Sequence, residues 1–384
     1  MSRDRINVLF VTHADKKGGA EQSLIHLINY MDTRRYRVFF LCPAEAAYLH
    51  EITNEHQHIP FTLGSIKQRF GLGYLGAVRF IKRLVKEHNI QIIHANGWRA
   101  PWYVAPLKFM SRAKLVWHHR DHTHLKMYNY VLPRFFHQVI CISHFVADSI
   151  AGSNKTVIYN GVDARRSPND KMRKLMEDGE LLIGTFGRIV EWKRYHLMIE
   201  AVKRLSDRGM TNWRLLIVGD TSMDNTDDYY NGLKRKVAEY GLSRQVVFYG
   251  YSSKPLQLMG ECDVTINFSM NEPFGRVVIE SLMMKTPVIV ADSGGAPEII
   301  RETSGGMIVK DGDIHALADA LHDIGSRVVD YEELVRSGHR NVLEKFSMEE
   351  IITRVEQLYG TLLGHQPEVE AGLAVQAVSK GGRG

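Results

Sequence analysis

The sequence contains few cysteines and no long apolar run. Among its 384 residues only Cys42, Cys141 and Cys262 are cysteines, and each lies in or beside an apolar, strand-like run. No paired spacing suggests a disulfide or a metal site, so we expect buried thiols in a reducing compartment. No apolar run approaches the ~18 residues of a membrane span, and the first 13 residues do not resemble a signal peptide. The sequence therefore predicts a cytoplasmic protein.

The charge of the chain is mildly basic. The formal net charge is +6 and the isoelectric point is near 9.0, which suits phosphate-bearing ligands or an anionic membrane surface. Because no RNA- or DNA-binding signature accompanies this charge, we expect no nucleic-acid partner. The length suits two domains better than a single core.

The sequence also lacks the Gly-x-Gly-x-x-Gly fingerprint of dinucleotide-binding folds, yet strands and helices alternate along it. Apolar runs predict strands at residues 6–11, 36–42, 90–94, 114–118, 139–143, 155–159, 181–186, 213–219, 245–249, 263–268, 287–291 and 307–309. Helical patterns between them predict an α/β fold of parallel sheets with helices on both faces. Ligands of such sheets bind at the carboxyl ends of the strands, so polar residues there are the candidates for a site.

Several strand ends in the first half carry such residues. Gly18 and Gly19 stand between a strand and a helix, where glycine lets the backbone approach a phosphate; the alternative is an ordinary tight turn. Asn96 follows another strand. The run from His118 to His124 could hydrogen-bond a substrate hydroxyl or phosphate, or it is a loop of solvated histidines. Its spacing does not match the usual metal ligands, so we expect no metal.

Residues 65–88 combine basic and apolar side chains, and aromatic residues follow soon after. A basic amphipathic surface of this kind can dock on anionic lipid, which predicts peripheral contact with the inner face of a membrane. A helix with an apolar stripe against the core and a solvated basic face explains the same pattern, and we favour it.

The second half opens as the first does, with a strand, a glycine loop and a helix. Its loop carries Gly187, Arg188, Lys193 and Arg194. Cations at a strand end suit a pyrophosphate; the alternative is a solvated basic turn. Tyr251 follows a later strand end, where it could lie against a nucleobase.

The stretch Asn271-Glu272-Pro273-Phe274-Gly275-Arg276-Val277-Val278-Ile279-Glu280 follows a buried strand. A proline and a glycine shape a turn, and a helix is predicted at residues 276–285. If Glu272 projects outward, the N–H groups at the helix start are free for a ligand phosphate. Glu280 has apolar neighbours and needs a hydrogen-bonding partner such as a ribose diol. The alternative is a capping Glu272 and a solvated Glu280.

Together these motifs resemble the retaining glycosyltransferases of family four. The resemblance rests on Glu272-Pro273-Phe274-Gly275 with Glu280, Gly187-Arg188 with Lys193, Gly18-Gly19-Ala20-Glu21 and Asn160-Gly161-Val162-Asp163, and it spans residues 6–362. It implies the GT-B architecture, two facing Rossmann-like domains with the active site in the cleft. The expected parts are an acceptor-side domain at 1–165, a nucleotide-sugar domain at 166–346, a helix crossing back at 347–364 and a flexible tail at 365–384.

The resemblance also implies roles for individual residues. Glu280 would hold the ribose hydroxyls of a nucleotide-sugar, and Glu272 would contact the hydroxyls of the donor sugar. Arg188 and Lys193 would bind the donor diphosphate, together with backbone N–H groups of residues 274–276.

On the first domain, Gly18 and Gly19 would approach the diphosphate and sugar. The family places a histidine after the fourth main strand, where this sequence reads His118-His119-Arg120-Asp121; either histidine or Arg120 could face the donor. Asn96 and Asp121 would lie on the acceptor side.

The chemistry is compatible with these roles. Breaking a sugar–phosphate bond leaves negative charge on the diphosphate, which many families neutralise with a metal held by Asp-x-Asp. No such motif stands in a fitting place, and Arg188, Lys193 and helix N-termini can stabilise that charge instead. We therefore expect metal-independent, retaining transfer without a cofactor, from a UDP-sugar first and a GDP-sugar second. The acceptor would be a hydroxyl, in cell-surface glycan or natural-product synthesis.

Two other functions fit the same architecture. A nucleotide-sugar epimerase or hydrolase would turn over the donor with no acceptor present. A non-catalytic module would bind the nucleotide-sugar without turnover. The missing fingerprint argues against a dehydrogenase.

Overall fold

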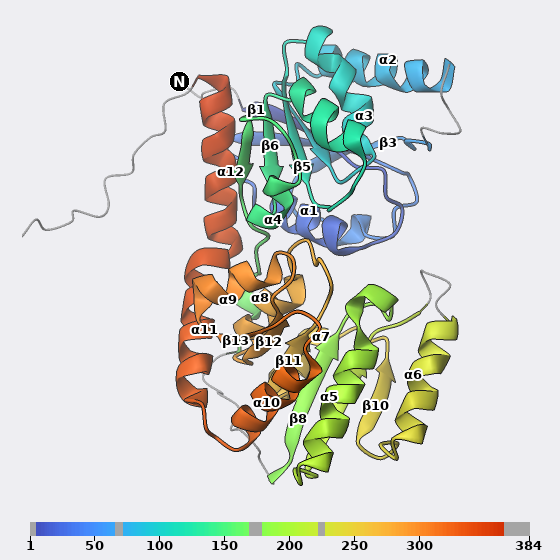
Figure 1. Cartoon of the computed structure of the whole chain (residues 1–384). Coiled ribbons are helices and arrows are strands. Elements are labelled where there is room, and N and C mark those ends of the chain that lie inside the picture. The colour runs from blue at the N-terminus through green and yellow to red at the C-terminus, as the bar shows by residue number, and fades with distance from the viewer. Residues whose placement is uncertain (1–4, 66–71, 169–178, 222–226, 365–384) are drawn as a thin grey trace, which may run out of the picture.

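The computed structural model describes residues 5–65, 72–168, 179–221 and 227–364. They form two α/β bodies, one above the other in Figure 1, and a long C-terminal helix that lies along the first body. Residues 66–71 of the predicted basic segment and the predicted tail at 365–384 lie outside the described residues. Within the described ranges, no helix combines the length and the apolar character that crossing a membrane requires.

Seven parallel strands form the sheet of the first body, in the order β3-β2-β1-β4-β5-β6-β7. They are β1 (Ile6–Val11), β2 (Tyr36–Cys42), β3 (His56–Pro60), β4 (Ile92–Asn96), β5 (Lys114–His119), β6 (Gln138–Cys141) and β7 (Lys155–Val157). The strand order reverses between β1 and β4, which are neighbours in the sheet. Ligands of parallel sheets bind beyond the carboxyl ends of the strands at such a point.

Six parallel strands form the sheet of the second body, in the order β10-β9-β8-β11-β12-β13. They are β8 (Leu181–Phe186), β9 (Trp213–Val218), β10 (Val246–Gly250), β11 (Val264–Asn267), β12 (Val288–Ala291) and β13 (Gly306–Val309). Here the order reverses between β8 and β11. The two bodies therefore repeat one design, and the prediction of a GT-B fold with two Rossmann-like domains is confirmed.

All twelve predicted strands are present, with ends that differ by at most two residues, but β3 was missed. Of its five residues only Ile59 is buried, and the segment pairs with β2 at the edge of the sheet. Such a strand forms because a neighbouring edge is available, and its sequence carries little periodic signal. The three cysteines are buried free thiols, as predicted.

Helices cover both sheets. In the first body they are α1 (Gly19–Tyr30), α2 (Leu72–Glu87), α3 (Ala100–Val104) and α4 (His144–Asp148). In the second they are α5 (Tyr195–Asp207), α6 (Asp227–Glu239), α7 (Pro255–Glu261), α8 (Arg276–Met283), α9 (Ala296–Thr303), α10 (Ile314–Gly325) and α11 (Tyr331–Phe346). In α2, Ile81 and Leu84 are buried while Lys82 and Arg83 are exposed, which confirms the favoured amphipathic interpretation.

The last helix, α12 (Met348–Leu363), belongs structurally to the first body although it follows the second in the chain. Its buried side chains, among them Ile351 and Val355, pack in one cluster with β1 and α1. Ser347 forms an isolated parallel bridge with Val162, which starts the helix on that surface. The helix thus joins the two bodies a second time.

A buried chain of polar side chains runs from α12 to the end of β5. The Tyr359 hydroxyl lies 2.5 Å from His94 Nδ1, and His94 Nε2 lies 3.1 Å from His118 Nδ1. Arg120 Nη2 lies 3.3 Å from the same His118 atom. Because a guanidinium only donates, His118 Nδ1 accepts, His94 carries its proton on Nε2, and Tyr359 donates to His94.

This arrangement requires neutral imidazoles. Burial holds the pKa of His94 and of His119 at about 3, and that of His118 well below its ordinary value of 6.5. In the unfolded chain these groups take up protons near their ordinary pKa. The stability that depends on their neutral form is therefore fully present above about pH 6.5. It is lost progressively as the pH falls from there toward about 3.

We predict that the free energy of unfolding falls between pH 6 and pH 4, by about 1.4 kcal/mol per pH unit for each such histidine. His119→Leu should reduce this slope by the contribution of one histidine, because it removes one buried imidazole. The ring of His119 packs between Trp117 and Tyr128. Urea unfolding, followed by circular dichroism at several pH values, measures how the free energy of unfolding depends on pH. The exposed His50 offers a control, and His50→Asn should keep the wild-type slope. An unchanged slope in His119→Leu would contradict the prediction.

Candidate active site

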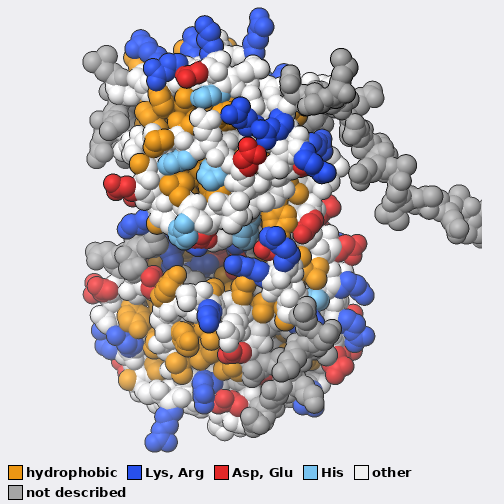
Figure 2. Space-filling view, turned by 180° about the vertical axis from the view of Figure 1, so that it is seen from behind, with side chains coloured by type: hydrophobic (Ala, Val, Ile, Leu, Met, Phe, Trp, Pro, Cys, Tyr) orange, Lys and Arg blue, Asp and Glu red, His pale blue; other side chains and the backbone are white. Residues whose placement is uncertain are grey.

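A cavity of about 620 Å³ lies between the two bodies, at the carboxyl ends of strands from both sheets. Figure 2 shows the surface hollowed at this level, with Lys and Arg side chains in the hollow. The first body contributes residues that follow β1, β5, β6 and β7, and the second contributes residues that follow β8 and β11. The cavity therefore lies where the points of reversed strand order in the two sheets face each other.

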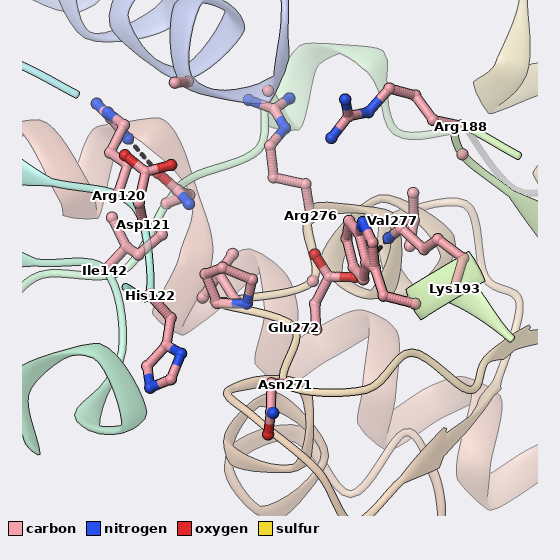
Figure 3. Close-up of a pocket in the computed structure, with 18 of the residues that line it drawn as sticks. Arg120, Asp121, His122, Ile142, Arg188, Lys193, Asn271, Glu272, Arg276 and Val277 are labelled. Carbon is pink, nitrogen blue, oxygen red and sulfur yellow. Dashed lines mark hydrogen bonds and ion pairs between the residues drawn. The ribbon is translucent and has the colours of Figure 1, made fainter. Parts of the chain in front are cut away.

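Glu272 projects into this cavity from the turn that follows β11 (Figure 3). Its carboxylate accepts a hydrogen bond from the Lys193 ammonium, and both side chains are mostly buried. Lys193 also lies over the Trp192 ring, 4.5 Å from its centroid. Glu272 therefore has a cationic partner and is not the helix cap that the alternative interpretation assumed.

The β12–α9 loop holds the backbone of Glu272 in place. Gly295 N donates to the Glu272 carbonyl at 2.7 Å, and Asn271 N donates to Ser293 Oγ at 3.0 Å. Gly294 has a φ of +73°, and a Cβ there would lie 2.3 Å from the Glu272 carbonyl oxygen. Only glycine permits so close an approach of the two loops.

The start of α8 has no side-chain cap. Its N-cap is Gly275, in the left-handed region with a φ of +97°. Backbone N–H groups of the first turn of a helix attract anions when no side chain caps them. Phe274, Gly275, Arg276 and Val277 all line the cavity. This end of α8 therefore faces the space where a phosphate would lie.

Arg276 connects the two bodies through its side chain. Its Nη2 donates to Glu280 Oε1 at 2.7 Å, and its Nη1 donates to Ser23 Oγ on α1 at 2.7 Å. In Figure 3 its side chain extends toward α1. Glu280 is thus a partly buried, paired carboxylate and not a solvated one. From the sequence, only the backbone N–H group of Arg276 had been given a role. The contact of its side chain with Ser23 was missed because the two residues are 253 positions apart in the chain.

A second set of contacts fixes the Glu272 turn against the first body. Ser143 Oγ donates to the carbonyl of Pro273 at 2.6 Å. Beside it, the Glu298 carboxylate on α9 accepts from the backbone N–H groups of His144 and Phe145, each at 2.8 Å. Glu298 thus caps α4 from the other body, where a carboxylate is electrostatically favoured.

Arg120 brings a buried cation to the cavity wall from the first body. It is 5% exposed, and its Nε and Nη1 donate to Asn96 Oδ1 and Asn160 Oδ1, each at 2.6 Å. The pKa of Arg120 falls to about 9, chiefly because the side chain is buried; Glu21 opposes this shift and Arg276 adds to it. Arg120 therefore remains protonated near neutral pH. Asn96 supports it from beneath and does not itself line the cavity.

Of the three candidates left open at this strand end, only Arg120 lines the cavity, together with its neighbours Asp121 and His122. His118 lies beneath, in the chain that leads to Tyr359. His119 points into the core, with its ring 4.6 Å from that of Trp117. Alternate side chains of β5 turn to opposite faces of the sheet, so His119 lies on the face opposite to His118 and Arg120. Arg120 follows the last residue of β5 and lies over His118, which it contacts.

Most of the predicted site residues meet in this cavity. Those that line it are Gly19, Arg120, Asp121, Arg188, Lys193, Glu272, Phe274, Gly275, Arg276 and Glu280. Those that do not are Gly18, Asn96, His118, His119 and Tyr251. Tyr251 is 74% exposed, just beyond the end of β10, so its proposed contact with a nucleobase stays a prediction.

Sequence reasoning did not assign Trp192, Asn160, Met270 or Asn271 to the site, although all of them line the cavity; His122, which also lines it, had been considered only as part of the run from His118 to His124. A signal was present for Trp192, Asn160 and Asn271, because each stands inside a strand-end loop or motif that had been singled out, whereas Met270 precedes the motif that begins at Asn271. The pattern identified the loops but not which side chains turn inward.

The cavity wall carries charges of both signs. Arg120, Arg188, Lys193 and Arg276 contribute cations, while Asp121, Glu272 and Glu280 contribute carboxylates. Such a wall can hold an anionic group and a polyhydroxylated group side by side, because cations bind phosphate and carboxylates accept from hydroxyls. Among the residues that the structure describes, no group of three or more His, Cys, Asp or Glu could hold a metal ion.

Two sequence families match this chain in succession. "Glycosyltransferase Family 4" matches residues 17–166, and "Glycosyl transferases group 1" matches residues 167–340. The capsular polysaccharide biosynthesis glycosyltransferase CapM of Staphylococcus aureus is 27% identical over 57% of this chain. The lipopolysaccharide core biosynthesis glycosyltransferase LpsE of Rhizobium meliloti is 30% identical over 46% of it. The chain spans only 58% and 49% of the length of these two proteins.

Solved structures resemble the chain over nearly its whole length. Alr3699/HepE of Anabaena in complex with UDP is 25% identical, with a TM-score of 0.77, over 93% of this chain and all of that one. The same protein in complex with UDP-glucose is 24% identical, with a TM-score of 0.77 and the same coverage.

The family matches cover residues 17–340 without a gap, and they leave out β1, the end of α11, α12 and the ends of the chain. The chain shares its fold of two Rossmann-like bodies with the solved neighbours. The chain therefore belongs to the family 4-type glycosyltransferases with the GT-B fold.

Proposed function

We propose that this protein transfers a sugar from a nucleotide-sugar, a UDP-sugar in the first place, to a hydroxyl acceptor. One observation carries the proposal. Two cations, Arg188 and Lys193, and two glutamates, Glu272 and Glu280, line a single cavity together with the uncapped start of α8. The cations suit a diphosphate, and the carboxylates suit the hydroxyls on either side of it.

Each group has a place in the reaction. Glu280 accepts hydrogen bonds from the ribose hydroxyls, and Glu272 accepts from hydroxyls of the donor sugar. As the sugar–phosphate bond breaks, negative charge grows on the leaving diphosphate. Lys193, Arg188 and the N–H groups of α8 stabilise that charge, so the step requires no metal ion. The buried Arg120 adds a fixed positive charge on the facing wall.

The biological role follows from the relatives. The names of CapM and LpsE assign them to capsular polysaccharide and lipopolysaccharide core biosynthesis, and the HepE complexes contain UDP and UDP-glucose. We infer that this chain acts in the synthesis of a cell-surface polysaccharide, with the acceptor entering beside Asp121 and His122. A nucleotide-sugar hydrolase or epimerase would consume the donor equally well without an acceptor.

The first test is nucleotide selectivity. Thermal unfolding with UDP, GDP and ADP, each in excess, should show the largest rise in melting temperature with UDP, because a bound ligand stabilises the folded state. UDP-sugars that raise it further are then assayed for UDP release with a pool of lipid-linked and soluble glycans. No stabilisation by any nucleotide would refute the proposal, and acceptor-independent release would favour the hydrolase.

Replacing Lys193 tests how the leaving group is stabilised. We predict that Lys193→Ala lowers kcat/KM by about 10²–10³-fold, the effect of removing one preorganised donor. The fold should stay intact, as judged by circular dichroism. Lys310→Ala is the matched control, since Lys310 is exposed and does not line the cavity. Near wild-type turnover in Lys193→Ala would remove this residue from the site.

Chelation tests the absence of a metal requirement. We predict that transfer continues at an unchanged rate after dialysis against EDTA, because protein cations stabilise the diphosphate. The same assay with added Mg²⁺ or Mn²⁺ should show no strict dependence. Activity that disappears with EDTA and returns with either ion would contradict this mechanism.

The stereochemical outcome is a separate prediction. We expect the product to keep the anomeric configuration of the donor, as the resemblance to retaining enzymes implies. Proton NMR of the purified product measures the coupling at the anomeric carbon, with the donor as reference. Inversion would show that the reaction follows another course while leaving the donor site in place.

A further inference from the structure

Trp192 is a large aromatic residue of the cavity wall that takes no part in the hydrophobic cores. It lines the cavity from the second body, on the tight turn η7 (Glu191–Lys193) that follows β8. Within the part of the chain that the structure describes, it belongs to none of the clusters of packed apolar residues. Burial of apolar surface in a core therefore does not explain an indole at this position.

The ring of Trp192 faces the ammonium group of the next residue in the chain. Lys193 Nζ lies 4.5 Å from the centroid of the indole. The face of an aromatic ring is negative, and tryptophan attracts a cation over its ring more strongly than tyrosine or phenylalanine does. The chain turns tightly through η7 and Arg194, whose φ is +57°, and the lysine side chain folds back over the indole beside it.

Two further groups confine the Lys193 side chain. Its ammonium group donates to the Glu272 carboxylate, and Figure 3 shows both side chains in the cavity. The backbone of Gly187 lies close on another side, where an added Cβ would be 3.6 Å from Lys193 Cε and 3.8 Å from Nζ. Because an ammonium group has three N–H donors, the Glu272 contact leaves donors for a ligand phosphate.

The backbone of Trp192 is tied to the segment that carries Glu272. The Trp192 carbonyl accepts a hydrogen bond from Met270 N at 2.8 Å, and Met270 stands two residues before Glu272 in the chain. Trp192 therefore acts on both members of the ion pair. Its carbonyl joins the two loops, and its ring directs the lysine toward the glutamate.

The geometry points to Trp192 as a positioning residue that holds Lys193 where it stabilises the leaving diphosphate. A lysine side chain is a flexible four-carbon stem, and fixing it costs conformational entropy. A second carboxylate could also hold Lys193, but it would repel the diphosphate. An aromatic ring attracts the ammonium group without adding a negative charge. The inference rests on the proposed function, because Trp192 acts only through Lys193.

Replacing the ring tests this role. We expect Trp192→Leu to lower kcat/KM by about threefold to thirtyfold, the range of one cation–π contact. The loss should fall mainly on kcat, because negative charge on the diphosphate grows in the transition state. Trp192→Phe keeps an aromatic face and should recover part of the rate. Tyr230→Leu is the matched control, since its ring centroid lies 4.4 Å from Lys234 Nζ but outside the cavity wall, and it should keep wild-type turnover.

Fluorinated tryptophan separates the electrostatics of the ring from its shape. Ring fluorines withdraw electron density from the face of the indole and change its size little. Site-specific incorporation at position 192 of analogues with an increasing number of fluorines should lower kcat/KM stepwise. In a Lys193→Ala background the same series should have no effect, because the cation is absent. A role of Trp192 in packing alone predicts no such trend.

Nuclear magnetic resonance detects the contact without any turnover. In protein isotope-labelled at lysine Cε, the ring current of the indole should shift the Hε protons of Lys193 upfield. Trp192→Leu should abolish this shift, and the Lys193→Ala spectrum identifies the signal. The thermal shift with UDP shows that each variant is folded and binds nucleotide.

Three results would overturn the inference. One is a Lys193 signal without the ring-current shift, and another is a rate that does not respond to the fluorines. The third is wild-type turnover in Trp192→Leu while Lys193→Ala loses activity, which would refute the role of Trp192 and leave the proposed function standing. Wild-type turnover in Lys193→Ala would instead refute the proposed role of the lysine, and the inference would fall with it.

Discussion

The buried guanidinium of Arg120 is the group on which the first body depends most. A charge in the interior is tolerated only when hydrogen bonds replace its hydration. Here Asn96 at the end of β4, Asn160 beyond β7 and His118 in β5 supply them. His118 is oriented in turn by His94 and Tyr359. The crossing-back helix, three strand ends and the cavity wall thus form one connected polar unit.

The second body depends on the turn that carries Glu272. Three neighbours constrain it: the β12–α9 loop through Gly295, the first body through Ser143, and Lys193 through its ammonium group. Arg276 then ties the following helix to α1. Because the contacts of Ser143 and Arg276 join both bodies beside the cavity, the positions of Glu272 and Glu280 depend on how the two halves pack together. A change at Ser143 or Glu298 would therefore act on the cavity from outside it.

The cavity wall carries both cations and carboxylates. This combination suits the sugar diphosphate that we propose as the donor, because cations bind phosphate and carboxylates accept hydrogen bonds from hydroxyls.

The sequence alone was sufficient for the architecture. Apolar runs with helical segments between them predicted twelve of the thirteen strands in the described residues, because a strand buried on both faces needs apolar residues throughout. Short motifs such as Glu272-Pro273-Phe274-Gly275 located the loops at the strand ends. The sequence alone did not show which side chain of His118-His119-Arg120 faces the cavity, and it did not reveal β3. Those outcomes, like the Arg276–Ser23 bridge, depend on contacts between residues far apart in the chain. Local pattern specifies elements, whereas the direction of a side chain and its partner are decided only when those elements pack together.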